Sequence, residues 1–350
     1  VAGPVVLDRL HLKKGIGRAI LVNSGNANAC TGPDGMRVAK EMAQLVATAL
    51  GSAPHTIFIG STGVIGQPLP IDCIKNAVPS LLARVTRRGG NEAAQAIMTT
   101  DLKPKQVAVR ARLGGRMVTV GGMAKGSGMI HPNMATMLGY LTTDAVIGRS
   151  ALQTALSQAV DRSFNCITVD GDTSTNDTVL CLANGMAGNQ TLKPGSADFR
   201  RFCAMVETVC RTLALKICWD GEGVTKVVRV EVTRARSTTA AKQIAQTIAT
   251  SNLVKTALFG GDANWGRVMA ALGRAGVPID PSRVSLQFGD VPMVRNGQGL
   301  GRVAEQKLTK VFRAKEFTIL VDLAQGQAGA HMWTTDLSYE YVRINASYRS

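Results

Sequence analysis

Short apolar runs alternate with helix-like segments along almost the whole chain, which has 350 residues. Several of the runs alternate apolar with polar residues, a pattern typical of half-buried β-strands. We expect strands at 18–23, 56–60, 106–109, 117–120, 179–183, 227–232, 257–260, 317–322 and 340–345. Between them, apolar residues recur at three- and four-residue steps, which predicts helices with one apolar face. These helices are expected at 36–50, 71–85, 149–161, 197–217, 238–250 and 264–274.

The order of these elements indicates a mixed α/β fold with helices packed over sheets. The Gly- and Pro-rich breaks at 121–133, 184–195 and 295–302 are neither long nor charged enough to be flexible linkers. The first break gathers four glycines, a lysine and a proline ahead of an apolar stretch that contains Ala135 and Thr136. This stretch is either a turn that leads into a buried strand or the site of a nucleophilic threonine.

Composition narrows the classes of function. Hydrophobic residues make up 45% and charged residues 18% of the chain, which suits a folded protein with a large core. The net charge of +16 would suit a polyanion-binding surface, but Lys and Arg occur in short patches interleaved with other residues. Aromatic residues reach only 4%, which disfavours stacking on nucleic-acid bases. The positive charge can instead attract small anionic substrates.

The seven cysteines form no CxxC pair and no Cys/His spacing that suits zinc, so we expect no metal site and no cofactor. Their odd number favours a reducing compartment. No apolar run approaches the length of a membrane span, and no signal peptide is visible. We therefore expect no membrane or nucleic-acid partner and a cytoplasmic location, or an organellar matrix or stroma in a eukaryote.

Two glycine-rich segments invite a chemical interpretation. Residues 121–128 fail as a phosphate-binding loop, because glycine follows the lysine and no helix obviously comes next; a loop that brings Lys125 close to Thr136 fits better. Residues 60–66 follow a strand, and their glycines free backbone N–H groups beside the hydroxyl of Thr62. Such a group of donors suits an oxyanion pocket, although an ordinary strand-to-helix turn explains the spacing as well.

Two acidic segments are less specific. Residues 170–177 resemble half of a calcium loop but lack the closing glutamate, which favours a structural hydrogen-bonded turn. Residues 220–226 follow a long predicted helix and are either a C-cap turn or a place where Glu222 reaches a ligand amine. The four histidines are scattered and no GxSxG motif is present, so a Ser-His-Asp triad finds little support.

Seven short motifs, in order along the chain, closely resemble the ornithine acetyltransferase family, also called glutamate N-acetyltransferase or ArgJ. They are GSTGVIG at 60–66, TTD at 99–101, GGMAKGSGMI with PNMATML at 121–138, DGDTSTND at 170–177, DGEGVTK at 220–226, GGDANWGR at 260–267 and the ending YVRINASYRS. The resemblance implies a layered α/β/β/α sandwich of the self-cleaving DmpA/ArgJ-like type and an α₂β₂ or larger assembly.

The resemblance also implies that the chain cuts itself between Ala135 and Thr136, into fragments 1–135 and 136–350. The Thr136 hydroxyl would attack the Ala135 carbonyl, and water would release a new N-terminal threonine. Its α-amine, with a reference pKa of about 8, would then serve as the base for the hydroxyl. The acetyl group would pass from N-acetylornithine to Thr136 and then to glutamate, in a ping-pong cycle within arginine biosynthesis. Whether acetyl-CoA is a second donor stays open.

Matching the motifs residue by residue implies the site. Thr62 and Gly63 would form the oxyanion hole. Substrate contacts would fall on Thr99, Lys125, Thr136, Glu222, Asn345 and Ser350. Thr100 is the alternative to Thr99, because the spacing to the next motif varies. The charges suit zwitterionic substrates, with a lysine for a carboxylate and a glutamate for an amine.

Two other functions are compatible with parts of the sequence. A related self-cleaving aminopeptidase or amidase would pass the acyl group to water rather than to glutamate. A basic nucleic-acid-binding protein would stay uncut and bind with a steep salt dependence. The set of Lys125, Glu222 and Asn345 argues against the first, and the scarcity of aromatic residues argues against the second.

Overall fold

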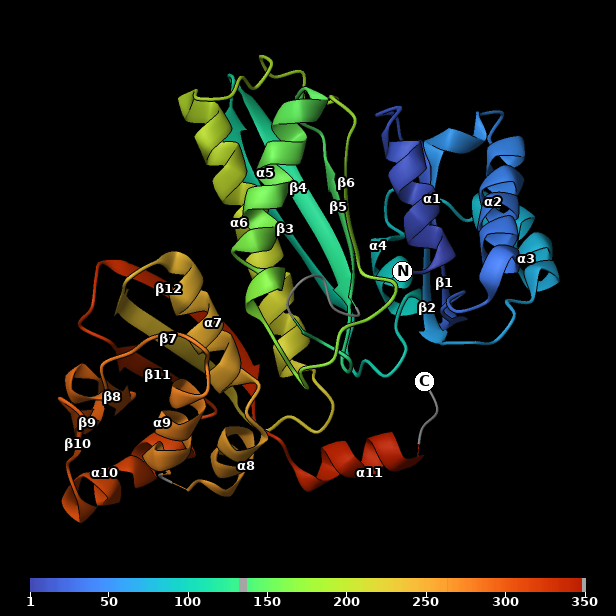
Figure 1. Cartoon of the computed structure of the whole chain (residues 1–350). Helices are drawn as coiled ribbons and strands as arrows, with labels where there is room; N and C mark the ends of the chain where they lie inside the picture. Colours follow the sequence, from blue (N-terminus) through green and yellow to red (C-terminus); the bar gives the residue numbers. More distant parts are fainter. Residues whose placement is uncertain (132–136, 263, 348–350) are drawn as a thin grey trace. The chain divides into compact units, whose positions relative to one another are not determined.

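The computed structural model describes residues 1–131, 137–262 and 264–347 of the chain (Figure 1). These residues form two compact units. The first consists of Val1–Asn165 and Asp172–Ile217, and the second of Cys166–Gly171 and Cys218–Ser347. Each unit has its own sheets and its own core.

The first layers of unit 1 are helices packed on a parallel pair of strands. The strands are β1 (Ala19–Asn26) and β2 (Ile57–Val64), and the helices are α1 (Gly3–Leu12), α2 (Gly32–Ala49) and α3 (Ile71–Ala83). In α2, Val38, Met42 and Val46 recur at four-residue steps and are buried against Ile57 and Ile59 of β2. This one-sided apolar face explains why the helix forms and lies on the strands.

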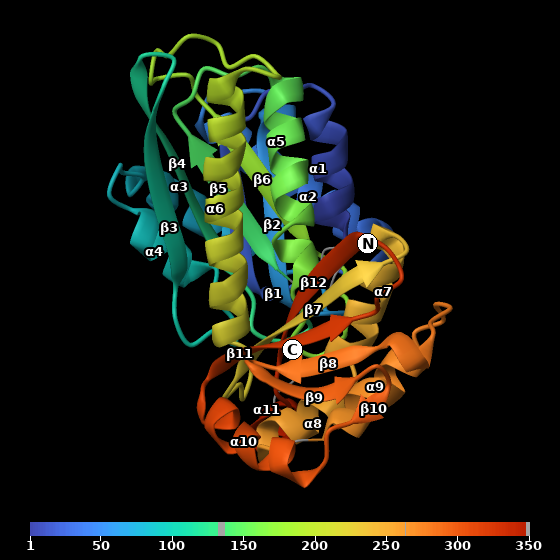
Figure 2. The same cartoon turned by 90° about the vertical axis from the view of Figure 1, so that its left-hand side faces the viewer.

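The second pair of layers in unit 1 is a four-stranded sheet covered by two helices. Its strands are, in spatial order, β3 (Lys105–Leu113), β4 (Arg116–Lys125), β5 (Leu138–Thr143) and β6 (Thr178–Ala183). The helices α5 (Arg149–Asp161) and α6 (Ala197–Trp219, whose last two residues belong to unit 2) run side by side over one face (Figure 2). The short helix α4 (Gly90–Ala96) precedes β3 and packs on β3 and β4.

An apolar cluster joins the two sheets of unit 1. It contains Phe58 of β2, Tyr140 of β5 and Leu180 of β6, together with Ile97 and Leu138. Because helices cover the outer face of each sheet, the layers run α/β/β/α. The layered sandwich expected from the resemblance is therefore confirmed.

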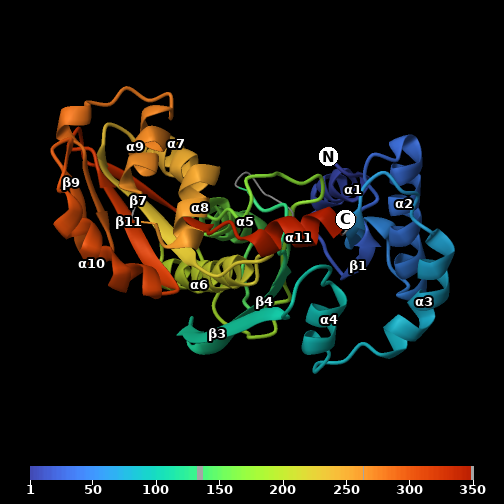
Figure 3. The ribbon, with the colours of Figure 1, turned by 90° about the horizontal axis from the view of Figure 1, so that it is seen from below.

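Unit 2 is built on a six-stranded mixed sheet. The strands are, in spatial order, β10 (Gln298–Gly299), β9 (Val291–Arg295), β8 (Ser285–Phe288), β11 (Glu316–Asp322), β7 (Val227–Ala235) and β12 (Ala328–Thr335). The helices are α7 (Thr238–Ala249), α8 (Asn252–Gly260), α9 (Trp265–Gly273), α10 (Arg302–Arg313) and α11 (Tyr339–Ser347). Helices α7 and α9 lie together on one side of the strands (Figure 3), and α7 packs on β7 and β12.

All six expected helices are confirmed, but two expected strands are wrong. Residues 257–260 end helix α8, which Ser251 caps by accepting a hydrogen bond from Val254 N and which Gly261 ends in a left-handed conformation. Residues 340–345 lie in helix α11, where Ser338 Oγ accepts from Tyr341 N. In both places a short run of apolar residues suggested a strand. The neighbouring residues that cap a helix explain why a helix forms instead.

Three short 3₁₀ turns complete the described structure, at Pro54–Thr56, Phe164–Cys166 and Pro281–Arg283. The longest helix, α6, has 23 residues. Among the described residues, no helix combines the length and the apolar composition that a membrane span needs.

Candidate active site

The residues predicted for the site fall into three groups. Thr62, Gly63, Thr99 and Lys125 lie in unit 1. Glu222 and Asn345 lie in unit 2. Ala135, Thr136 and Ser350 lie outside the residues that the structure describes.

Thr62 and Gly63 lie within β2, where the two parallel strands approach closely. Gly63 faces Gly25 of β1 and has φ of +129°. A Cβ at Gly63 would lie only 2.2 Å from the carbonyl carbon of Gly25, so only glycine fits without a shift of the backbone. Thr62 is 2% exposed. The strand continues through both residues, where the sequence alone suggested that it had already ended.

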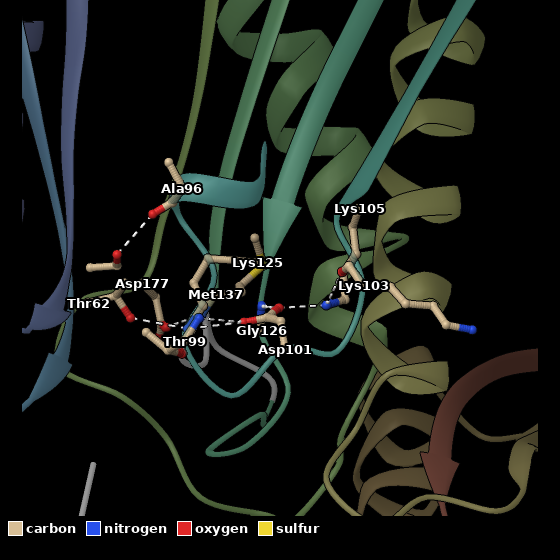
Figure 4. Close-up of polar contacts among 11 residues, drawn as sticks. Thr62, Ala96, Thr99, Asp101, Lys103, Lys105, Lys125, Gly126, Met137 and Asp177 are labelled. Atoms are coloured by element: carbon tan, nitrogen blue, oxygen red, sulfur yellow. Dashed lines mark hydrogen bonds and ion pairs between the residues drawn. The ribbon is translucent and has the colours of Figure 1, made fainter. Parts of the chain in front are cut away.

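Lys125 brings two of the predicted hydroxyls together (Figure 4). It is the last residue of β4 and is buried. Its Nζ donates to Thr99 Oγ1 at 2.8 Å and to Thr62 Oγ1 at 3.2 Å. The contact with Thr99 favours that residue over Thr100. The sequence suggested a loop at Lys125, but this residue ends a strand. The backbone that carries the ammonium is therefore held in the sheet.

Asp101 is the centre of this cluster, and sequence reasoning assigned it no role. Its Oδ1 accepts from Lys105 Nζ at 2.5 Å and from Gly126 N at 2.8 Å. Its Oδ2 accepts from Thr99 N at 3.1 Å and lies 3.9 Å from Lys125 Nζ. Burial by itself would raise the pKa of this carboxyl, but the charges of Lys125 and Lys105, together with the hydrogen bonds from Gly126 and Lys105, outweigh burial and hold the pKa below its usual value.

Asp177 is a second carboxyl that the sequence did not single out. Its Oδ1 accepts from Met137 N at 3.0 Å, and Met137 directly follows Thr136 in the chain. Its Oδ2 has no hydrogen-bond partner among the described residues. Burial raises the pKa of Asp177 to about 8, although the backbone hydrogen bonds from Met137 and Ser174 and the charge of Lys125 oppose the rise. The sequence signal that points to Asp177 is its position as the last residue of the DGDTSTND motif.

The ends of the predicted cleavage segment are fixed by strand pairing. Lys125 of β4 pairs with Leu138 of β5 in antiparallel register. On the other side, Leu138 pairs with Thr178, the residue after Asp177. Thr136 is covalently linked to Met137, so its chain position lies two residues before this pairing.

In unit 2, Glu222 and Asn345 are in contact. Asn345 Nδ2 donates to Glu222 Oε2 at 2.8 Å and to Tyr341 O at 3.0 Å. Ser338 Oγ donates to Gly223 O at 2.6 Å, which fixes the turn after α6 against the start of α11. Two residues that the family motifs assign to substrate binding, Glu222 and Asn345, are therefore in contact within this unit.

The described residues offer no obvious place for a metal. No three histidine, cysteine, aspartate or glutamate side chains among them gather closely enough to hold an ion. A cavity of about 720 Å³ lies in unit 1, lined by β3, β4 and α4 residues together with Arg87 and Tyr140. None of Thr62, Thr99 and Lys125 lines this cavity, so it is separate from the cluster.

Comparisons with known proteins assign the chain to a family. The model of the ArgJ family matches residues 1–350. The arginine biosynthesis bifunctional protein ArgJ of Symbiobacterium thermophilum is 53% identical over 349 residues, covering 100% of this chain and 87% of that protein. The protein of the same name from Geobacter sulfurreducens is 50% identical, covering 100% of this chain and 89% of its own.

One solved structure supports this assignment. The crystal structure of the arginine biosynthesis bifunctional protein ArgJ from Bacillus halodurans is 42% identical, with a TM-score of 0.59, and covers 61% of this chain and 100% of that chain. An ornithine acetyltransferase from Mycobacterium tuberculosis, solved with ornithine, is also 42% identical, but its TM-score of 0.36 adds nothing to the comparison of folds. The family match over the whole length and the near-complete coverage of relatives show that this chain belongs to the ArgJ family.

Proposed function

We propose that this chain is a self-cleaving glutamate N-acetyltransferase that moves the acetyl group of N-acetylornithine to glutamate through an acetyl-Thr136 intermediate. The observation that carries the proposal is the buried Lys125 ammonium that bridges the hydroxyls of Thr62 and Thr99 at the end of β4. Because β4 pairs with β5 from Leu138 onward, this polar cluster adjoins the strand that begins two residues after Thr136. The names of the relatives place them in arginine biosynthesis.

In the cleavage step, Thr136 Oγ1 attacks the carbonyl carbon of Ala135. Its proton is transferred to the departing nitrogen of Thr136 as the peptide bond breaks, which leaves an ester and a free α-amine. Water then hydrolyses the ester and leaves the Ala135 carboxylate and a free Thr136 hydroxyl. The products are the fragments 1–135 and 136–350, for which we propose an α₂β₂ assembly.

In the transfer step, the α-amine of Thr136 takes the hydroxyl proton, since its pKa of about 8 in reference peptides suits a base near neutral pH. The hydroxyl attacks the acetyl carbonyl of N-acetylornithine, and the developing oxyanion accepts hydrogen bonds from Thr62 and the Gly63 backbone. The α-ammonium of Thr136 then passes the hydroxyl proton to the amide nitrogen, the bond between that nitrogen and the acetyl carbon breaks, and ornithine leaves while the acetyl group stays on Thr136 as an ester. Glutamate then takes the acetyl group from the ester by the reverse steps.

Charge supports the choice of substrates. The Lys125 ammonium suits a substrate carboxylate, and the buried Glu222, held by Asn345, suits a substrate amine. We also assign Thr99 and Ser350 to substrate binding, from the family motifs. Relatives are named bifunctional, which supports acetyl-CoA as a second donor. We also propose that the enzyme acts in the cytoplasm.

Intact mass spectrometry of the denatured protein tests this proposal, with a Thr136→Ala variant beside the wild type. We expect two fragments that end at Ala135 and begin at Thr136 in the wild type, and one chain in the variant. Transfer of the acetyl group to glutamate should exceed hydrolysis in the cleaved protein. An uncut wild type, or a Thr136→Ala variant that still transfers acetyl groups, would contradict the assignment of Thr136 as the nucleophile. A preference for water would identify an amidase instead.

A further inference from the structure

We propose that Asp101 is a positioning residue of the transfer site, whose carboxylate holds the Lys125 ammonium and thereby sets the direction of the Thr62 hydroxyl. This inference rests on the proposed function, because it assigns a task to Thr62 and Lys125. It concerns a residue to which the family motifs assign no substrate contact, but which hydrogen-bonds Thr99 and lies beside Lys125. Every contact that supports it lies among the described residues of unit 1.

The first step of the argument is the number of chain segments that Asp101 ties together. Its two oxygens accept from the backbone N–H groups of Thr99 and Gly126 and from the Lys105 ammonium. These donors come from the turn before β3, from the start of β3 and from the residue after β4. The Asp101 side chain is 0% exposed, so these bonds do not compete with water.

The second step is the chain of contacts from Asp101 to the oxyanion hole. Asp101 Oδ2 attracts Lys125 Nζ at 3.9 Å, and the same Nζ donates to Thr62 Oγ1 at 3.2 Å. Since the Thr62 oxygen accepts a hydrogen from Lys125, its own O–H hydrogen points away from the ammonium. The hydroxyl then offers its hydrogen in a fixed direction, which is what stabilisation of an oxyanion requires.

The third step is the balance of charge. Lys105 and Lys125 contribute two positive charges, and Asp101 contributes one negative charge, so the three buried groups carry one net positive charge. A single positive charge at low dielectric favours the developing oxyanion and a substrate carboxylate. Lys105 thus offsets the charge of Asp101, and the cluster keeps one net positive charge beside the Thr62 hydroxyl.

Removal of the Asp101 charge should change how activity depends on pH. The titratable groups that face Lys125 among the described residues are Asp101 from the turn and Asp177 from the segment before β6, and Lys105 of β3 contacts Asp101. Without the Asp101 carboxylate, Lys125 loses a group that favours its protonated form. An opposite charge at this distance shifts a pKa by roughly 1–3 units, so Lys125 should lose its proton at a lower pH.

The experiment compares the pH profiles of kcat/KM for acetyl transfer in wild type, Asp101→Asn and Lys105→Met, each checked for complete cleavage by intact mass. For Asp101→Asn we expect a loss of roughly 10²-fold at pH 7.5, as for loss of an oxyanion donor, and an alkaline limb at least about one pH unit lower. Lys105→Met removes the ion pair between Lys105 and Asp101 but leaves the Asp101 carboxylate beside Lys125. The alkaline limb of its pH profile should therefore not shift to lower pH. Ionisation of the substrates affects the wild type and all variants equally, so it does not cause a difference between their pH profiles.

Controls separate this charge effect from general loosening. Lys105→Arg should keep the wild-type profile, and so should Asp8→Asn, which alters another buried aspartate of the same unit. An unshifted alkaline limb in Asp101→Asn, or equal downward shifts in Asp101→Asn and Lys105→Met, would overturn the proposal. If Asp101→Asn does not fold, a downward shift in Lys105→Met alone overturns it. An uncut or inactive wild type would instead refute the proposed function.

Discussion

Asp101 and Asp8 are both buried aspartates of unit 1, and each accepts a backbone N–H, yet their pKa values are shifted in opposite directions. Asp101 has the ammonium groups of Lys105 and Lys125 within 4 Å, and its pKa lies below the usual value. Asp8 of α1 accepts from Ile59 N at 2.8 Å, and its other oxygen has no hydrogen-bond partner among the described residues. Burial raises the pKa of Asp8 to about 8.

The difference shows that burial raises the pKa of a carboxyl inside this sandwich unless neighbouring positive charges offset it. Tyr140 is a titratable group that interacts electrostatically with Asp8, and its own hydroxyl has no partner among the described residues. Burial, followed by the charge of Asp8, raises the pKa of that tyrosine. The Asp8 region therefore behaves as part of the packed interior, while the Asp101 region keeps permanent charges next to the candidate site.

The largest effect should come from breaking the charged region. Asp101→Ala leaves two buried ammonium groups without their carboxylate, and we expect the free energy of unfolding to fall by about 3–5 kcal/mol. Urea unfolding at pH 7 in a Thr136→Ala background, where we expect a single chain, measures this loss. The double variant with Lys105→Met should lose less than the sum of the single losses, by roughly 0.5–3 kcal/mol. Strict additivity would contradict a coupled ion cluster.

A smaller effect, with a defined pH dependence, should come from Asp8→Asn. In the unfolded chain this carboxyl ionises near the ordinary aspartate pKa of 3.8, but in the fold it keeps its proton up to about pH 8. Between these values the folded state binds more protons, so wild-type stability falls as pH rises through this window. Asparagine removes this dependence.

The measurement for Asp8→Asn is urea unfolding at pH 5 and pH 9. We expect the free energy of unfolding of the variant, relative to wild type, to be about 2 kcal/mol higher at pH 9 than at pH 5. This difference is smaller than the whole pKa shift would give, because local relaxation reduces the cost of burying the ionised carboxylate. A difference that does not grow with pH would mean that Asp8 is already ionised in the fold. Asp177 titrates in both proteins and cancels from the comparison.

The smallest effect should come from Tyr140→Phe, which removes the buried hydroxyl near Asp8. A Cβ added at Gly60 would lie 1.9 Å from this oxygen, so the hydroxyl packs closely against the backbone of β2. Since removal of a buried hydroxyl without a partner is nearly neutral or stabilising, the change in thermal melting should correspond to less than about 1 kcal/mol. A loss above about 2 kcal/mol would reveal a hydrogen bond to that hydroxyl.

The sequence predicted the helices and several site residues because both signals are local or carried by motifs. Thr62, Thr99 and Lys125 belong to three separate motifs, and the fold brings their side chains together. The role of Asp101 could not be predicted in this way. It depends on the antiparallel register of β3 and β4, which pairs Lys105 with Ala124 and so places Lys105 beside Lys125.

The position of Asp177 beside the candidate site could not be predicted for a similar reason. Its motif suggested a structural turn, and its burial and its contact with Met137 N arise only when β5 and β6 pair in parallel. The two wrong strands at 257–260 and 340–345 have a different cause, because a few apolar residues were read without the caps on either side. Long-range register and local caps thus account for most of what the sequence analysis missed.

The pairing of β4 with β5 has a consequence for how the two proposed fragments must be produced. Residues Val120–Lys125 pair with Leu138–Thr143, so a cut between Ala135 and Thr136 would leave a continuous sheet shared by both fragments. Made separately, each fragment would expose an unpaired strand edge, which is a template for aggregation. Synthesis as one precursor lets the sheet close before the chain is cut, and recombinant co-expression of two halves would lack that protection.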